Sequence, residues 1–133
     1  MGYASELDGE FILYMKLGDI MKLTNKQFKE FKGYCDHYIN LYGMGRFNVY
    51  YELKKLGDNY ATCNMAGRTV TIALNAELDE FAAEHVDLRR TAKHEVIHMI
   101  IMDYDFTHDN AGVREADDYH EGLVVLLTKM MRD

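Results

Sequence analysis

Two histidines four positions apart, His94 and His98, are the feature that most constrains this chain. If residues 88–102 form a helix, this spacing places both imidazoles on one face, roughly 6 Å apart, where they can share one metal ion. Glu95 directly follows the first histidine, so its carboxylate lies beside such an ion rather than on it. The pattern therefore predicts a metal-binding helix with a carboxylate next to the metal.

The residues around the pair predict that this helix is buried. Asp87 is suited to the N-cap position, and the helix is apolar nearly all round through Val96, Ile97, Met99, Ile100 and Ile101. Burying two imidazoles and a carboxylate without hydrogen bonds or a metal would cost several kcal/mol. The alternative is an ordinary core helix whose histidines are exposed or hydrogen-bonded within the protein.

The pentapeptide His94-Glu95-Val96-Ile97-His98 also matches the H-E-x-x-H pattern of zinc hydrolases. In such a site, zinc lowers the pKa of a bound water to about 7. A neighbouring carboxylate then takes the proton of that water and returns it to the leaving group. Glu95 is therefore the expected general base.

Length and charge narrow the class of protein. We expect one domain over residues 1–133, with residues 1–23 an extension of uncertain structure. The formal charge of −7 argues against nucleic acid as the main partner. Cys35 and Cys63 are too few for a disulfide framework or a four-cysteine zinc site, and they fit a reducing cytosol. No segment resembles a secretory leader or a membrane span, so we expect a cytoplasmic protein with no membrane partner.

Periodicity predicts an α+β fold. Within residues 1–23, Leu7, Phe11, Ile12 and Met15 lie at helical spacing. Thr24 and Gln27 form a capping box that opens a helix through about residue 41. Alternating apolar residues predict strands over 46–53, 60–64 and 68–74, with turns at 57–59 and 66–67. Together these segments predict a short three-stranded antiparallel sheet flanked by helices.

A catalytic zinc ion keeps three protein ligands, so a third is expected beyond the pair. After a polar turn over 103–112, we expect a second helix over 113–131 whose inward face carries Ala116, Leu123, Leu127 and Met130. His120 lies well inside this apolar face, and Glu115 lies at its edge, whereas Glu121 and Asp118 point away. His120 is therefore the expected third ligand and Glu115 the main alternative, followed by Glu121, Asp117 and His108.

The extended metzincin motif is absent, because its third histidine would fall at Tyr104 and its glycine at Ile101. Tyr104 is a candidate transition-state donor, or else an aromatic of the core or rim. Asp103 or Asp105 can orient a ligand imidazole through its free N–H, or belong to the turn alone.

The arrangement over residues 24–131 resembles a minimal zincin-type, gluzincin-like metallopeptidase, and in particular the small predicted metallopeptidases of phage and prophage genomes. In gluzincin-like relatives the third ligand is a glutamate on the following helix, which maps onto Glu115 through the run Glu115-Ala116-Asp117. Matching the spacing of Leu123, Val124 and Leu127 instead puts His120 in that place. The resemblance also implies that strand 68–74 is an edge strand able to pair with an extended peptide.

The leading hypothesis is a Zn2+-dependent hydrolase of a peptide bond in a peptide or protein substrate. His94, His98 and either His120 or Glu115 would hold the metal, with Glu95 as general base. The alternative is a metal-binding or protein-interaction module with little catalysis, for which ten tyrosines and nine methionines supply an adaptable contact surface. A third hypothesis is a toxin or regulatory factor that acts on a host protein through the same site.

Overall fold

The computed structural model describes the backbone of residues 20–109, 113–115 and 118–133, and their side chains except Glu80 and residues 106–120. Helices and strands alternate in an α+β arrangement, as the sequence predicts. The strands are β1 (Ile20–Lys22), β2 (Asn48–Lys54), β3 (Ala61–Ala66), β4 (Thr69–Asn75), β5 (Glu77–Asp79) and β6 (Val113–Glu115). The helices are α2 (Asn25–Leu41), α3 (Glu80–His85), α4 (Leu88–Asp109) and α5 (Asp118–Met130).

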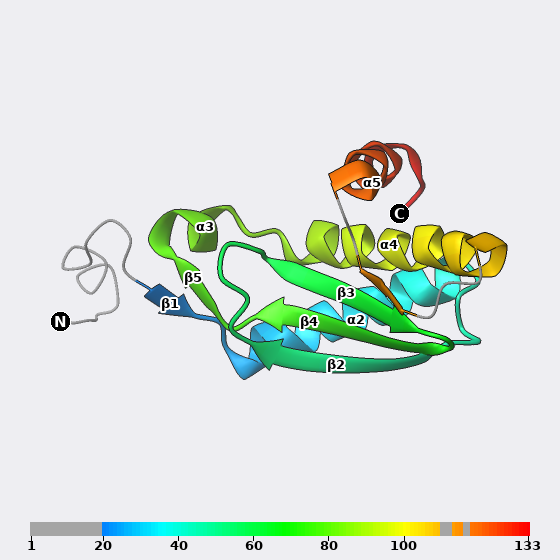
Figure 1. Cartoon of the computed structure of the whole chain (residues 1–133). Coiled ribbons are helices and arrows are strands. Elements are labelled where there is room, and N and C mark those ends of the chain that lie inside the picture. Colours follow the sequence, from blue (N-terminus) through cyan, green and yellow to red (C-terminus); the bar gives the residue numbers. More distant parts are fainter. Residues whose placement is uncertain (1–19, 110–112, 116–117) are drawn as a thin grey trace, which may run out of the picture.

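One sheet and two long helices form the main core. The sheet has the strand order β2-β4-β3-β6, and β1 and β5 form a separate antiparallel pair. Helices α2 and α4 pack against the sheet, and α5 lies on α4 on the side away from the sheet (Figure 1). Fully buried core side chains come from both helices and from the sheet, among them Phe31, Tyr38, Ile72, Val96 and Met99. Helix α4 is therefore enclosed by the sheet, α2 and α5.

The four-stranded sheet is mixed, so the prediction of an antiparallel three-stranded sheet is wrong. Strands β3 and β4 form the expected antiparallel hairpin, with Gly67 at φ 62° in the turn. Strand β4, however, inserts between β3 and β2 and runs parallel to β2, pairing Asn48 with Thr69 and Lys54 with Asn75. Residues 70 and 72–75 of β4 are all buried, and a strand buried on both faces belongs in the middle of a sheet. Segment 68–74 is consequently not an edge strand.

The helix boundaries confirm two sequence predictions and correct two others. The capping box of Thr24 and Gln27 is present, and the carboxylate of Asp87 accepts a hydrogen bond from the backbone N–H of Arg90 at the start of α4. Helix α4 continues to Asp109, beyond the predicted end at 102. The predicted helix 113–131 divides into β6 and α5, because residues 113–115 pair with β3. Of residues 1–23, Ile20–Lys22 are a strand, and the predicted helical residues 7–15 lie outside the described residues.

A buried amide holds the loop that joins β2 to β3. The side chain of Asn75, at the end of β4, is fully buried. Its oxygen accepts hydrogen bonds from the backbone N–H groups of Leu56 and Glu77, and its NH2 group donates to the carbonyl oxygens of Gly57 and Asn59. Three of these hydrogen bonds go to backbone groups of residues 55–60 and fix the path of that loop, and the fourth ties it to the start of β5.

Replacing Asn75 with alanine should lower the free energy of unfolding by about 2 to 4 kcal/mol, because buried backbone groups of the loop lose their partners. Chemical denaturation measures this change. Asn59→Ala is the matched control, since the Asn59 side chain is exposed in the same loop. Equal stability of the two variants would contradict the anchoring role of Asn75.

Candidate metal centre

Helix α4 places both histidines on one face, as the spacing predicts. The ring centroids of His94 and His98 lie 4.9 Å apart. The side chain of His98 is 1% exposed and that of His94 is 23% exposed, so the pair lies at the boundary between core and surface. On the other faces of the helix, Ala92, Val96 and Met99 are fully buried. Apolar packing on those faces fixes the rotation of α4 about its axis and hence the direction of both imidazoles.

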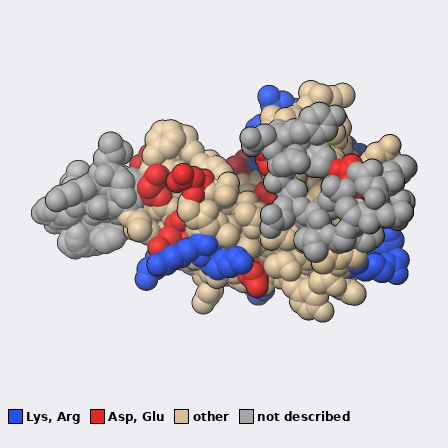
Figure 2. Space-filling view, viewed as in Figure 1, with Lys and Arg blue, Asp and Glu red and all other residues tan. Residues whose placement is uncertain are grey.

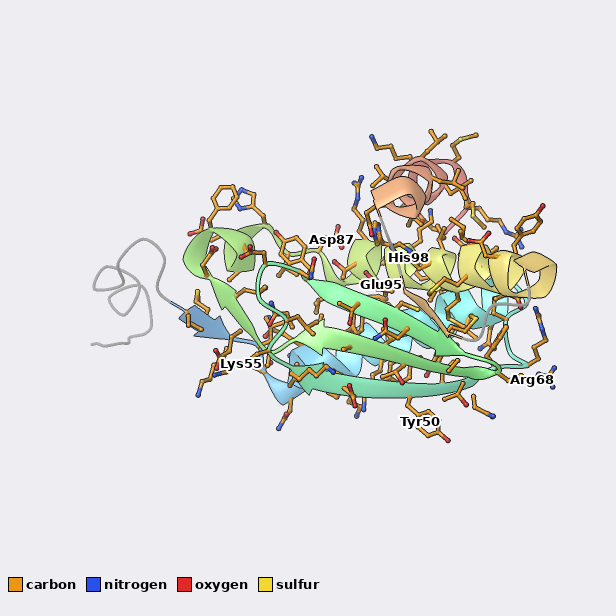
Figure 3. The ribbon with its side chains drawn as sticks, viewed as in Figure 1. Tyr50, Lys55, Arg68, Asp87, Glu95 and His98 are labelled. Carbon is orange, nitrogen blue, oxygen red and sulfur yellow. The ribbon has the colours of Figure 1, made fainter. Side chains whose placement is uncertain are left out.

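The third member of the site is Glu121, in the first turns of α5. Its Oε1 lies 2.5 Å from Nε2 of His94, and its Oε2 lies 3.0 Å from Nε2 of His98. One ligand atom from each of the three residues lies within 4.8 Å of the other two, which is a grouping able to hold a metal ion. Figure 3 shows His98 and Glu95 on the part of α4 that lies between β3 and α5. The site thus joins side chains from two helices.

The orientation of Glu121 contradicts the helical wheel drawn from the sequence. That wheel took the face with Leu123, Leu127 and Met130 as inward, yet Met130 is 71% exposed and Leu123 is also exposed. The residues that α5 buries against α4 are Val124 and Thr128, which share a helix face with Glu121. Because residues 123–127 are continuously apolar, hydrophobicity alone could not identify the buried side of this helix.

The predicted third ligands His120 and Glu115 have backbones in α5 and β6, but their side chains lie outside the described residues. The same holds for the side chains of His108 and Asp118, and Asp117 is not described at all. Glu115 belongs to a strand rather than to the predicted helix, and it pairs with Asn64. These residues remain predictions, whereas Glu121 is the acidic residue that the described part of the chain brings to the two histidines.

Two further candidates lie away from the site. Asp103 forms an ion pair with Arg46, with 2.6 Å between Oδ2 and Nη2, so its carboxylate is directed to the segment before β2 rather than to an imidazole. Tyr104 is exposed on α4 and does not line the cleft around the histidines. A tyrosine that does line this cleft is Tyr60, from the loop before β3.

Glu95 occupies the position expected of a proton carrier. It is 5% exposed, lines the same cleft, and accepts no hydrogen bond from the described part of the chain. Burial, and secondly the nearby carboxylate of Glu121, raise the pKa of Glu95 to about 8. A carboxyl group with a pKa near neutrality can both accept and release a proton in that pH range.

Two thiols lie beneath Glu95, and both cysteines are free and buried. Burial, and secondly the charge of Glu95, raise the pKa of Cys35 and of Cys63 well above the usual range for a thiol. Neutral thiols of this kind behave as small apolar side chains, so they make the surroundings of Glu95 less polar.

The site opens into a cleft of about 1090 Å³ between α4 and the β2–β3 side of the molecule. Figure 2 shows this hollow between the α3 end of the molecule and helix α5. Strand β3 forms one wall, contributing Ala61, Thr62, Cys63 and Asn64. Strand β6 pairs with Asn64–Ala66 only, so within the described residues no strand covers the outer edge of Ala61–Cys63. Within the described residues, this stretch of β3 therefore has an outer edge without a strand partner, beside the candidate metal ligands.

Electrostatics favour a cation at this position. The carboxylate of Glu121 meets two imidazoles in a partly buried site, and Glu95 lies close enough to interact electrostatically with Glu121. A divalent cation beside them would stabilise the ionised form of both carboxylates. Nitrogen and oxygen donors together suit first-row divalent transition metals and zinc.

Searches of protein-family models, curated proteins and solved structures found no match to this chain. Among the described residues, no helix combines the length and apolar character needed to cross a lipid bilayer. Function is therefore inferred from the geometry of the site itself.

The raised pKa of Glu95 predicts a pH dependence of stability in the metal-free protein. The folded state keeps the proton on Glu95 up to about pH 8, whereas in the unfolded chain a glutamate ionises near pH 4.3. The folded state binds more protons between these values, so its stability is highest at the acidic end and falls as the pH rises.

Glu95→Gln should remove this decrease in the free energy of unfolding with rising pH, which amounts to at most about 1.4 kcal/mol per pH unit. Urea denaturation of metal-free wild type and variant at several pH values measures the difference in slope. Glu84→Gln, at an exposed position on α3, serves as the control and should follow the wild type. Parallel curves for wild type and Glu95→Gln would contradict the assignment.

Proposed function

We propose that this protein is a zinc-dependent metallopeptidase on a zincin-like scaffold, with His94, His98 and Glu121 as metal ligands and Glu95 as general base. The observation that carries the proposal is the convergence of Glu121 on both Nε2 atoms of the motif histidines, at 2.5 and 3.0 Å. Two nitrogen donors on one helix and a carboxylate on the following helix form one of the donor sets that hold catalytic zinc.

The donor set fits zinc in number and in chemistry. Three protein ligands leave one position for water or substrate, which distinguishes a catalytic zinc site from a closed structural one. Small side-chain shifts are sufficient to replace the direct contacts of Glu121 with bonds to a shared ion, because all three donor atoms already lie within 4.8 Å of one another. A divalent ion there would also reduce the repulsion between Glu121 and Glu95.

An extended peptide is the substrate that suits the cleft. Its volume of about 1090 Å³ slightly exceeds the range for small-molecule pockets, which is roughly 300–1,000 Å³. A peptide backbone can pair with the uncovered edge of Ala61–Cys63 and so pass the histidines in a defined register. This edge replaces the one that the resemblance assigned to residues 68–74, since that segment is the central strand β4.

Glu95 carries out both proton transfers, from the water and to the leaving amine. Zinc, when bound, supplies a Lewis acid that lowers the pKa of water and stabilises negative charge on the scissile carbonyl oxygen. The positive charge of bound zinc would favour the ionised form of Glu95. Its carboxylate then takes the proton of the attacking water and donates it to the departing amine, so that no net proton remains on the protein. Its burial between α4 and β3 keeps bulk water from competing for this proton.

Zinc binding tests the ligand set. Wild-type protein should bind one equivalent of zinc, and a chelator should lower its melting temperature, because zinc stabilises the folded state that contains the site. Glu121→Ala should weaken zinc binding by roughly 10²-fold or more, since one of three ligands is lost. Isothermal titration with zinc on metal-free protein measures this affinity.

The competing ligands provide the controls for that titration. His120→Ala and Glu115→Ala should leave the zinc affinity within a few-fold of wild type, and His94→Ala should abolish stoichiometric binding. If His120→Ala or Glu115→Ala greatly lowers the zinc affinity while Glu121→Ala hardly changes it, the third ligand is His120 or Glu115 instead. Absence of zinc in wild type, with no thermal shift on its addition, would end the proposal.

Catalysis is tested at Glu95, whose role is in chemistry rather than in metal binding. Glu95→Gln should keep the fold and one equivalent of zinc while hydrolysis falls by roughly 10² or more. Each zinc-loaded variant is incubated with a mixture of peptides of diverse sequence, and mass spectrometry detects the cleavage products. Cleavage by Glu95→Gln at the wild-type rate would contradict the general-base mechanism.

A metal-binding or protein-interaction module remains the second candidate, and the outer face of α5 favours it. Leu123, Leu126 and Met130 lie on one exposed side of this helix, and exposed apolar stripes are typical of contact surfaces. For such a module, zinc binding persists with the same ligand dependence, but wild type cleaves no peptide in the mixture.

A further inference from the structure

The end of α5 is fastened to the motif helix by a buried ammonium group. Lys93 directly precedes the first motif histidine, and its side chain is 6% exposed. Its Nζ donates hydrogen bonds to the carbonyl oxygen of Met131 and, at 2.9 Å, to the carboxylate of Asp133. The Asp133 carboxylate has a lowered pKa, chiefly because of its hydrogen bond with Lys93.

Helix α2 adds hydrogen bonds to the same segment. The hydroxyl of Tyr42 donates to the carbonyl oxygen of Arg132 at 2.7 Å, and Nε2 of His37 lies 2.9 Å from the backbone oxygen of Asp133. Residues 131–133 are therefore held by polar groups from two helices. Within this set, Lys93 is the member that belongs to the helix with the metal-binding histidines.

Among the side chains that the structure describes, the apolar contact between α5 and α4 forms a cluster separate from the main core. Its buried members are Ile97, Ile101 and Val124, and Leu127 and Met131 pack against them. Helix α5 crosses α4 rather than lying along it, and it is seen nearly end-on in Figure 1. An apolar cluster has no directional bonds, so it permits small rotations of one helix on the other. Polar contacts at the ends of α5 therefore contribute to its direction.

Along the chain, Glu121 precedes the buried Val124 of this contact, and the residues that bind Lys93 follow it. Measured along the helix, Glu121 precedes Val124 by about 4.5 Å, and Met131 follows Val124 by about 10.5 Å. Displacement of the far end of α5 therefore moves the Glu121 carboxylate in the opposite direction, by roughly half as much. Metal ligands tolerate displacements of only a few tenths of an ångström.

We propose that Lys93 is a positioning residue for the metal centre: by fixing Met131 and Asp133 to the motif helix, it sets the place of the Glu121 carboxylate opposite His94 and His98. The link to metal binding rests on the proposed function, whereas the link to Glu121 does not. Lys93 and His94 are consecutive residues of one helix, so their side chains point about 100° apart. Lys93 therefore contacts the end of α5, whereas His94 contacts Glu121 near its beginning.

A double-mutant cycle in zinc affinity tests this assignment. Lys93→Met removes the ammonium and keeps an apolar stem of similar length, and it should weaken zinc binding by roughly tenfold. In a Glu121→Ala background the same substitution should have almost no further effect, because its action passes through Glu121. Lys93→Arg should restore most of the affinity. Lys129→Met, an exposed lysine near the end of α5, should match wild type.

Equal weakening by Lys93→Met in both backgrounds would overturn the proposal, as would an unchanged affinity. If Lys93→Met fails to fold, Asp133→Asn takes its place in the cycle. Asp133 is largely exposed, so its substitution spares the core, and a smaller loss that again vanishes with Glu121→Ala is expected.

Nuclear magnetic resonance of the metal-free protein separates this inference from the proposed function. The side-chain nitrogen signals of His94 and His98 report their contact with Glu121 and need no metal. Lys93→Met should shift these signals in the direction produced by Glu121→Gln, and Lys129→Met should not. Signals in Lys93→Met that coincide with wild type would refute the positioning role, even if zinc binds as proposed.

Discussion

One carboxylate, that of Glu121, holds the functional part of this molecule together. It lies against two imidazoles of α4 while its own backbone belongs to α5, so it links two helices whose described apolar contact is separate from the main core. Most of the core is formed by the sheet with α2 and α4, which fixes the histidines. Polar contacts are found at both ends of α5, to the histidines at one end and to Lys93 at the other. A metal ion at the Glu121 end would therefore add an attachment between the helices as well as a chemical centre.

The sequence predicted the features that local periodicity and spacing control. The capping box at Thr24, the N-cap at Asp87, the hairpin at Gly67 and the shared face of His94 and His98 all arise from contacts between residues close in sequence. Such contacts depend on backbone geometry that repeats in every helix or turn. The α+β class follows from the same signals.

Features that depend on long-range pairing were not predictable in this way. The insertion of β4 between β2 and β3 is a choice among strand neighbours, and no local pattern distinguishes the possible orders. Likewise, α5 carries a continuous apolar run and has two faces that can be buried, so its rotation is decided by the shape of α4 and by the polar partners it meets. Glu121 was consequently assigned to the wrong side, while the motif residues on α4 were placed correctly.

The partial cover that β6 gives to β3 also bears on solubility. A long uncovered strand edge is a template for the strands of other molecules and promotes aggregation. Here β6 pairs with Asn64–Ala66, and no other described strand pairs with the outer edge of Ala61–Cys63. This stretch is shorter than a typical strand of about five or six residues. The opening can orient a short peptide, yet it offers too few hydrogen bonds to hold a neighbouring copy in a growing sheet. At the β3 side of the sheet, the room for a ligand strand and the length open to a neighbouring copy are thus both set by where a three-residue strand stops.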